Sequence, residues 1–159
     1  MTGYVMDLTK DGNPTLTEEV LIAARGQHVR RWTSPRNTYP EGKAAYLQWR
    51  EDLKQMHAKT TGDIMREAGY PEDSAQKVEA LIKKQLLKEP EGQVVEDALC
   101  LCFLEHQLAE FRLKETREKM VDILRKTWVR KMGEKGRAAA LKLPLGPEEL
   151  SLVKEALSA

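Results

Sequence analysis

The chain has little net charge, few cysteines and no long apolar run. Its 26 basic and 25 acidic residues leave a formal charge of +1 at pH 7, which argues against a whole-molecule electrostatic footprint for DNA or for an anionic membrane. Any basic function must therefore be local. No stretch approaches the about 20 apolar residues of a membrane-spanning helix, and residues 1–25 lack the apolar centre of a secretory signal.

The two cysteines point to a compartment where thiols stay reduced. Cys100 and Cys102 lie two positions apart in a helical pattern, so they point in different directions and cannot easily approach disulfide geometry. Buried free thiols are typical of intracellular proteins. We therefore expect an intracellular, cytoplasmic protein without a membrane partner. The 159 residues are enough for one core, and we expect one domain over residues 1–159.

Hydrophobic residues recur at helical spacing, without the period-two alternation of strands. The sequence therefore predicts an all-α, single-domain helical bundle. A capping box from Thr15 to Glu18 begins a helix that should reach about Arg31, after which Pro35 and Pro40 interrupt the chain. Gly69 is the expected left-handed cap of the next helix. The remaining helices are expected over residues 41–68 and 73–87, as a long helix after residue 92, over residues 115–132 and in the closing segment "LGPEELSLVKEALSA", with a turn at "GEKGR".

Several polar residues occupy positions that the helical pattern places near the core. His28 and Arg31 are three residues apart and share a helix face, while His57 lies within an apolar stripe. Glu96 and Asp97 open an otherwise apolar helix, and a buried unpaired charge there costs several kcal/mol. Two imidazoles and a carboxylate from three helices form either a metal site or a salt-bridged cluster, and spacing alone does not choose between them.

Basic residues gather around the loop that follows His28. We expect phosphate binding because guanidinium groups make paired hydrogen bonds to phosphate and stay charged. The alternative is that they only tie helices together by pairing with Glu91, Glu96, Asp97 or Glu105. An aromatic side chain at Trp32, Tyr39 or Trp49 could stack on a base. The predicted phosphate-binding residues are Arg30, Arg31, Arg36, Arg50, Lys84 and Lys88.

Four blocks of the sequence resemble the signature segments of a family called domain of unknown function 4202, found in bacteria and fungi. The blocks are "HVRRWTSPRNTYP", "YLQWREDLKQMHAK", "LLKEPEGQVVEDALCLCFLE" and "VDILRKTWVRKM". Together they cover almost the whole chain. The resemblance implies a helical fold, and relatives carry a further helix before the segment that matches "MTGYVMDL".

Two segments, "HAKTTGDIMREAGYPED" and "EDALCLCFLE", resemble the wider HD superfamily of metal-dependent phosphohydrolases. This second resemblance implies an HD-like fold and a divalent metal ion (Mn, Mg or Zn) held by His28, His57 and Asp97. It also suggests His28 and Glu96 as catalytic acid or base. The chain departs from the HD pattern at Val29, where that superfamily has its ligating aspartate.

Three functions remain open at this point. The first is an HD-like phosphohydrolase or phosphate-transfer enzyme that acts on a nucleotide or another phosphorylated small molecule. The second is a non-catalytic sensor that binds the same kind of ligand without a metal. The third is a helical interaction module, with RNA as one partner, in which the polar cluster is structural. The oligomeric state does not follow from the sequence.

Overall fold

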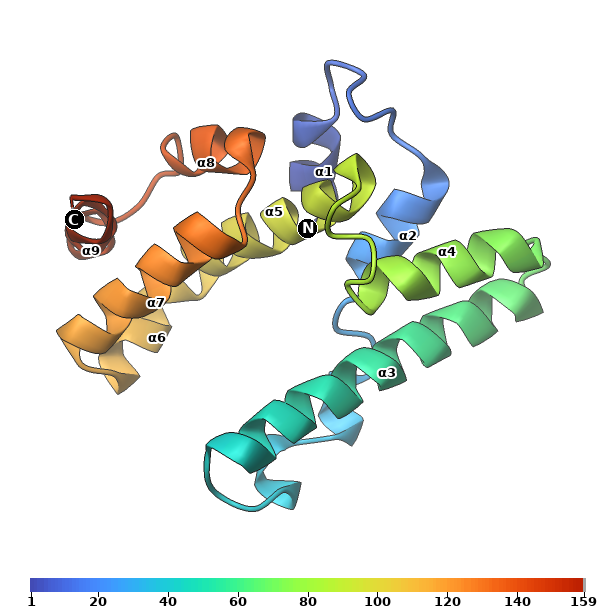
Figure 1. Ribbon diagram of the computed structural model, residues 1–159, viewed down its shortest axis with the longest axis horizontal. Coiled ribbons are helices and arrows are strands. Elements are labelled where there is room, and N and C mark those ends of the chain that lie inside the picture. The colour runs from blue at the N-terminus through green and yellow to red at the C-terminus, as the bar shows by residue number, and fades with distance from the viewer. Residues whose placement is uncertain (159) are drawn as a thin grey trace.

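The computed structural model describes residues 1–158, which contain nine α-helices and no β-strand (Figure 1). The predicted all-α class is therefore confirmed. Short 3-10 turns, η1 (Arg31–Thr33), η2 (Arg36–Thr38) and η3 (Arg112–Lys114), lie between helices. The helices are α1 (Thr2–Leu8), α2 (Glu18–Gly26), α3 (Lys43–Glu67), α4 (Glu72–Ile82), α5 (Pro90–His106), α6 (Leu108–Phe111), α7 (Arg117–Arg130), α8 (Glu134–Ala140) and α9 (Pro147–Leu157).

Helix α5 is the central element of the fold (Figure 1). Helices α1 and α2 pack on one part of it and α8 on another, while α4 packs between α2 and α3. Helix α9 packs against α7 at the far end of the molecule. Because α5 is contacted from several directions, its apolar residues are buried around most of its circumference. Helices from both the N-terminal and the C-terminal half of the chain therefore pack against α5.

The core is aliphatic and draws on helices from both halves. Removing these side chains from water is the main favourable contribution to folding. None of the helices within residues 1–158 is long and apolar enough to cross a membrane. Burial raises the pKa of the Cys100 thiol to about 12, so this cysteine is a packing residue. The largest fully buried apolar side chains are Val5, Val20, Val78, Ile82, Leu101, Leu108 and Met120.

Helix α2 is shorter than the sequence predicts. Its N-cap is Thr17, whose hydroxyl accepts a hydrogen bond from the Val20 amide, instead of Thr15 in the expected capping box. The helix ends at Gly26, and Arg30 adopts a left-handed backbone with φ of 51°. The expected end at Arg31 was therefore wrong, because the chain turns before the prolines are reached.

The ends of α3 and α4 share one geometry but differ in sequence. Gly69 has φ of 88°, and the amides of Gly69 and Tyr70 close onto the last turn of α3, as predicted. At the end of α4 the same position is occupied by Lys84, with φ of 60°. The predicted helix over residues 73–87 therefore ends at Ile82. The segment "GEKGR" is the start of α8 and not a turn, and α1 was not predicted.

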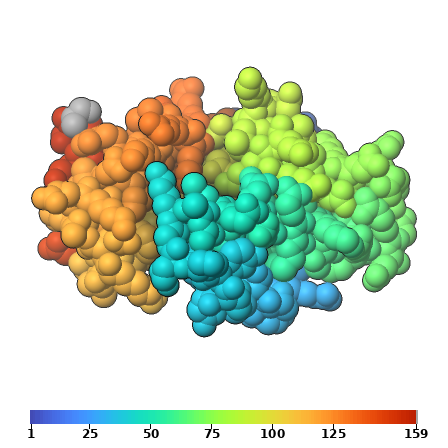
Figure 2. All heavy atoms as spheres, turned by 60° about the horizontal axis from the view of Figure 1, so that its bottom comes forward, coloured from blue at the N-terminus to red at the C-terminus, as the bar shows by residue number. Residues whose placement is uncertain are grey.

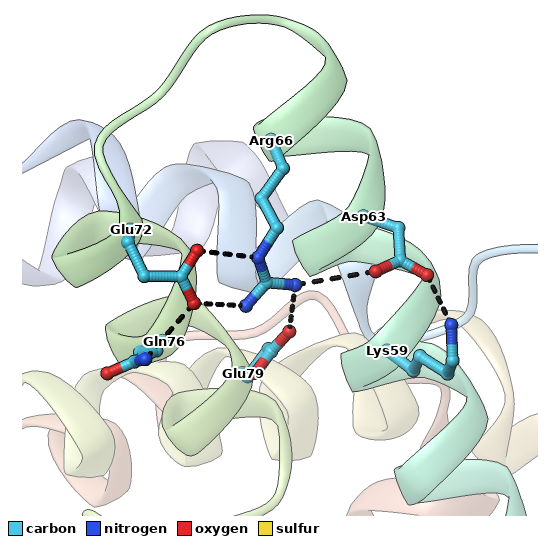
Figure 3. Close-up of polar contacts among 6 residues, drawn as sticks. All are labelled: Lys59, Asp63, Arg66, Glu72, Gln76 and Glu79. Carbon is cyan, nitrogen blue, oxygen red and sulfur yellow. Dashed lines mark hydrogen bonds and ion pairs between the residues drawn. The ribbon is translucent and has the colours of Figure 1, made fainter.

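An ion-pair network joins α3 to α4 (Figure 3). The Arg66 guanidinium donates two hydrogen bonds of 2.8 Å to Glu72 and one of 2.8 Å to Glu79. Asp63 receives a further bond from Arg66 and pairs with Lys59. Paired geometry of this kind orients a guanidinium more firmly than a single ion pair does. The network therefore fixes the α3–α4 hairpin that carries part of the site described below.

The close passage of the α4–α5 connection over α5 depends on Gly92. A Cβ atom at this buried position would overlap the backbone carbonyl of Leu86. We expect Gly92→Ala to lower the free energy of unfolding by about 1–3 kcal/mol, because backbone must shift to accept the methyl group. Urea unfolding followed by circular dichroism measures the change. Gly3→Ala on α1 is the control, since nothing lies within 4 Å of its Cβ position; equal stability of both variants would contradict the prediction.

Candidate functional site

Two histidines from different elements lie together where the end of α2 meets α3. His57 on α3 is only 4% exposed, and its Nδ1 lies 2.9 Å from the backbone carbonyl oxygen of Val29. A carbonyl only accepts, so Nδ1 carries the hydrogen in the neutral ring and Nε2 keeps its lone pair. The rings of His28 and His57 are 6.2 Å apart and nearly perpendicular. The structure therefore brings together two of the predicted site residues.

The loop after His28 folds back over α3 and carries Arg31 with it. The Arg31 guanidinium carbon lies 5.2 Å from the centre of the Trp49 ring, a cation–π contact. The Trp49 indole N–H donates a 2.9 Å hydrogen bond to the Ser34 carbonyl. Tyr39 donates a 2.8 Å hydrogen bond to Asp52 on α3. These contacts hold the loop in place, so Arg31 is positioned beside the histidine pair.

The third component comes from the end of α4. Lys84 forms a 2.7 Å ion pair with Glu96, which is on α5 and only 5% exposed. Burying a carboxylate without a partner would cost several kcal/mol, so this pairing is what allows Glu96 to occupy the core edge. The predicted catalytic residue Glu96 and the predicted phosphate-binding residue Lys84 are therefore direct partners.

We use the name basic cluster for His28, Arg30, Arg31, His57 and Lys84. Desolvation, followed by the positive charges of Arg31, His57 and Lys84, lowers the pKa of His28, although part of that side chain is exposed. Burial and the Arg31 charge also lower the pKa of His57, against an opposing effect of the Val29 hydrogen bond. Burial, with a smaller contribution from the nearby positive charge, therefore favours the neutral form of both imidazoles.

Backbone strain is concentrated in the same cluster. Arg30 and Lys84, with φ of 51° and 60°, are the two non-glycine residues with positive φ in the described chain, residues 1–158. A left-handed backbone costs about 1–2 kcal/mol for an ordinary residue, and glycine is the usual solution. Strain that persists without glycine is characteristic of functional sites. Both strained residues are cations, so the strained backbone positions are also positions of positive charge in the basic cluster.

Asp97 is held away from the histidine pair by a structural role. The side chain is 2% exposed, and its Oδ1 accepts hydrogen bonds from the Gly133 amide at 2.7 Å and from Gln93 at 3.0 Å. Gly133 is the N-cap of α8, so the carboxylate on α5 satisfies the start of α8. Burial raises the pKa of Asp97, although these hydrogen bonds oppose the change.

The structure does not assemble the predicted metal ligands into one group. Over residues 1–158, no three His, Cys, Asp or Glu side chains gather in a way that could hold a metal ion. His28 and His57 lie together, whereas Asp97 is bonded to the start of α8. Binding of Mn, Mg or Zn by these three residues stays a prediction.

The other predicted phosphate-binding residues are spread along the loop and α3. Arg36 donates to the carbonyls of Tyr39 and Pro40 within its own loop. Arg50 lies over the Tyr46 ring at 5.9 Å. Lys88 is exposed in the α4–α5 connection. Glu91 and Glu96 pair with lysines, and within residues 1–158 no arginine bonds to the acids that the structural alternative named.

Sequence reasoning missed what supports the cluster. No glycine in the sequence indicates the left-handed positions at Arg30 and Lys84. The apolar residues also keep their helical spacing beyond Lys84, although the helix has already ended. Gln93, which bridges Asp97 to the Lys131 carbonyl, was also missed. Its spacing of four residues before Asp97 is the one sequence signal for that contact.

The histidine pKa values predict how stability depends on pH. A group whose pKa is lower in the folded state binds more protons when unfolded, so protonation favours unfolding. We expect the melting temperature to fall as the pH drops below about 6.5, the ordinary histidine value. His57→Asn, which keeps a donor for the Val29 carbonyl, should reduce this dependence in a thermal melt between pH 5 and pH 8. The exposed His106→Asn is the control; an unchanged pH profile in His57→Asn would contradict the prediction.

The structural role of Asp97 predicts a graded effect of substitution. Asp97→Ala should lower the free energy of unfolding by about 1–3 kcal/mol, because it leaves the partly buried Gly133 amide without its acceptor. Asp97→Asn keeps an acceptor oxygen and should cost less. Chemical denaturation measures both. An Asp97→Ala variant of wild-type stability that loses stabilisation by Mn²⁺ would assign Asp97 to a metal instead.

The chain was compared with family models, curated proteins and solved structures. No curated protein and no solved structure matches it with significant similarity. One family model, described as "Domain of unknown function (DUF4202)", matches residues 1–153. The match spans α1 to the middle of α9 and includes every residue of the basic cluster. The chain therefore belongs to the family of the domain of unknown function DUF4202.

Proposed function

We propose that this chain binds a phosphorylated small molecule at the basic cluster. The observation that carries the proposal is the positive charge of Arg31 and Lys84 near the His28–His57 pair, with the strained Arg30 directly before Arg31 in the chain. At Arg30, a chain that needed the position only for turning would be more stable with glycine. Lys84 is retained through its ion pair with Glu96, whereas a ligand that needs its charge would explain the cation at Arg30.

The distribution of charge supports an anionic ligand. Residues 28–50 contain five arginines and lysines against one acidic residue, although the whole chain carries a net charge of only +1. Lys84 is partly neutralised by Glu96, so Arg30 and Arg31 supply the larger share of uncompensated charge. The fork of an arginine suits two oxygens of one phosphate group, and the neutral His28 imidazole can donate a further hydrogen bond, whereas the N–H of His57 is already donated to the Val29 carbonyl.

Phosphoester hydrolysis, the HD-like activity, is a second candidate. The observation that favours it is the buried Glu96 beside the basic cluster, because a carboxylate there could accept a proton from water during attack on phosphorus. Arginine and lysine would then stabilise the charge that develops on the phosphoryl oxygens. Two imidazoles fall short of the three protein ligands usual in catalytic metal sites, so no step through a metal is part of this candidate.

A thermal-shift experiment tests binding. Pyrophosphate and ribose 5-phosphate should raise the melting temperature of the chain, with a gain of about 2.7 kcal/mol when the ligand is about 100-fold above its Kd. Arg31→Ala and Arg30→Gly should abolish the shift, because each removes one of the uncompensated charges. Arg30→Gly should also be more stable than Arg30→Ala without ligand, since only glycine relieves the strain.

The control is Arg25→Ala on α2, which removes one exposed guanidinium that bonds to Thr2. Its melting shift should equal that of the wild type. Equal shifts in all variants, or none in the wild type, would contradict the proposal. Release of phosphate from sugar phosphates or nucleotides, lost in Glu96→Gln, would support the second candidate; binding without release would remove that candidate alone.

A further inference from the structure

A second set of side chains, exposed except for the buried Trp49, continues from the basic cluster along the first half of α3. Tyr46 and Trp49 are 5.9 Å apart, Arg31 lies over the Trp49 ring, and Arg50 lies over the Tyr46 ring. Two neighbouring aromatic rings on α3 therefore each carry one guanidinium group. We call Arg31, Trp49, Tyr46 and Arg50 the α3 ladder. The segment that carries it forms the front of the molecule in Figure 2, in blue to cyan.

Next to this ladder, Trp32 presents an unused aromatic ring. It is 78% exposed, the most exposed of the large hydrophobic residues among positions 1–158, and it follows Arg31 directly in η1. Within that part of the chain it has no aromatic stacking partner. The chain holds Trp32 out on a turn that starts at the strained Arg30. Removing a large aromatic ring from water is favourable, so a partner that covers Trp32 would gain this free energy on binding.

The cations of this surface have fixed positions. Cation–π contacts restrict the rotamers of Arg31 and Arg50, so less entropy is lost when either binds an anion. Arg30 and Lys43 are exposed on the same segment, and neither forms an ion pair with a residue of the described chain. Spaced phosphates and flat bases together match a surface of spaced cations with an open aromatic ring, whereas an acidic peptide would use only the cations.

We propose that this surface binds single-stranded nucleic acid. One base stacks on Trp32, and neighbouring phosphates pair with Arg30, Arg50 and Lys43. The proposal goes beyond the small-molecule function, since it uses residues outside the histidine pair and needs no catalysis. RNA and DNA share the chemistry that this surface recognises, so both are tested.

The test is fluorescence anisotropy with labelled twelve-nucleotide oligo(U) and oligo(dT). Both should bind at low salt. A plot of the logarithm of the association constant against the logarithm of the salt concentration should have a slope of about −0.7 for each phosphate contact. Trp32→Ala should weaken binding about 10-fold, the loss expected from one base–aromatic stack, while Trp32→Phe should retain most of it. Arg50→Ala should weaken binding and lower the salt slope. If only oligo(U) or only oligo(dT) binds, the natural ligand is assigned as RNA or as DNA, respectively.

Matched variants separate this surface from general charge effects. Leu141→Ala removes another exposed apolar side chain, 66% exposed, elsewhere on the chain, and Arg117→Ala removes an arginine that pairs with Glu155. Both variants should bind as the wild type does. Unchanged affinity in Trp32→Ala, or equal competition by polyglutamate, would overturn the proposal. A pyrophosphate melting shift that survives in Trp32→Ala leaves the small-molecule function standing. Oligonucleotide binding without any melting shift by pyrophosphate would instead support the nucleic-acid surface and contradict the small-molecule function.

Discussion

The ion pair between Lys84 and Glu96 is the interaction on which the arrangement of the site depends. Leaving Glu96 buried without a partner would cost about 3–5 kcal/mol, whereas the left-handed backbone at Lys84 costs about 1–2 kcal/mol. The balance favours the strained lysine over a relaxed glycine. This pairing also joins the end of α4 to the central helix α5. The position of one predicted phosphate-binding residue is therefore fixed by the requirements of the core.

The remaining parts of the basic cluster are held by contacts from α3. His57 is fixed through the Val29 carbonyl, and Trp49 is fixed through the Ser34 carbonyl, so the same helix anchors the chain on both sides of Arg31. Positive charge gathers there because the loop cannot move away from α3. Burial and this positive charge together lower the pKa values of both imidazoles and so favour their neutral forms. Strain, charge and neutral donors thus occur together in a chain whose overall charge is close to zero.

Helical periodicity was sufficient to predict the fold class and the position of α3, because both depend on the spacing of apolar residues. The ends of α2 and α4 were not predictable in the same way. At Arg30 and Lys84 the chain turns without glycine, and tertiary contacts override local signals. The segment that starts α8 also has two glycines, and it becomes helical because Asp97 supplies the acceptor for its first amide. Such long-range contacts leave no pattern in a single sequence.

The candidate site was predictable in its residue types but not in its grouping. His28, Arg31 and His57 were recognised as polar residues in unusual positions and Lys84 as a phosphate-binding residue, and the structure brings these four together. Asp97 has the same appearance in the sequence, yet it serves α8. A buried carboxylate needs a partner in either case, and which partner it finds depends on the relative placement of helices far apart in the chain.

The most direct measurement of the central claim is a crystal structure of the chain grown with tungstate, a heavy tetrahedral oxyanion that replaces phosphate. Its anomalous signal would locate the anion without reference to any assumed site. An ion bonded to Arg31 with His28 and Lys84 around it is the predicted result. Tungstate bound only elsewhere on the surface, with the basic cluster empty, would contradict the assignment of this cluster as the anion site.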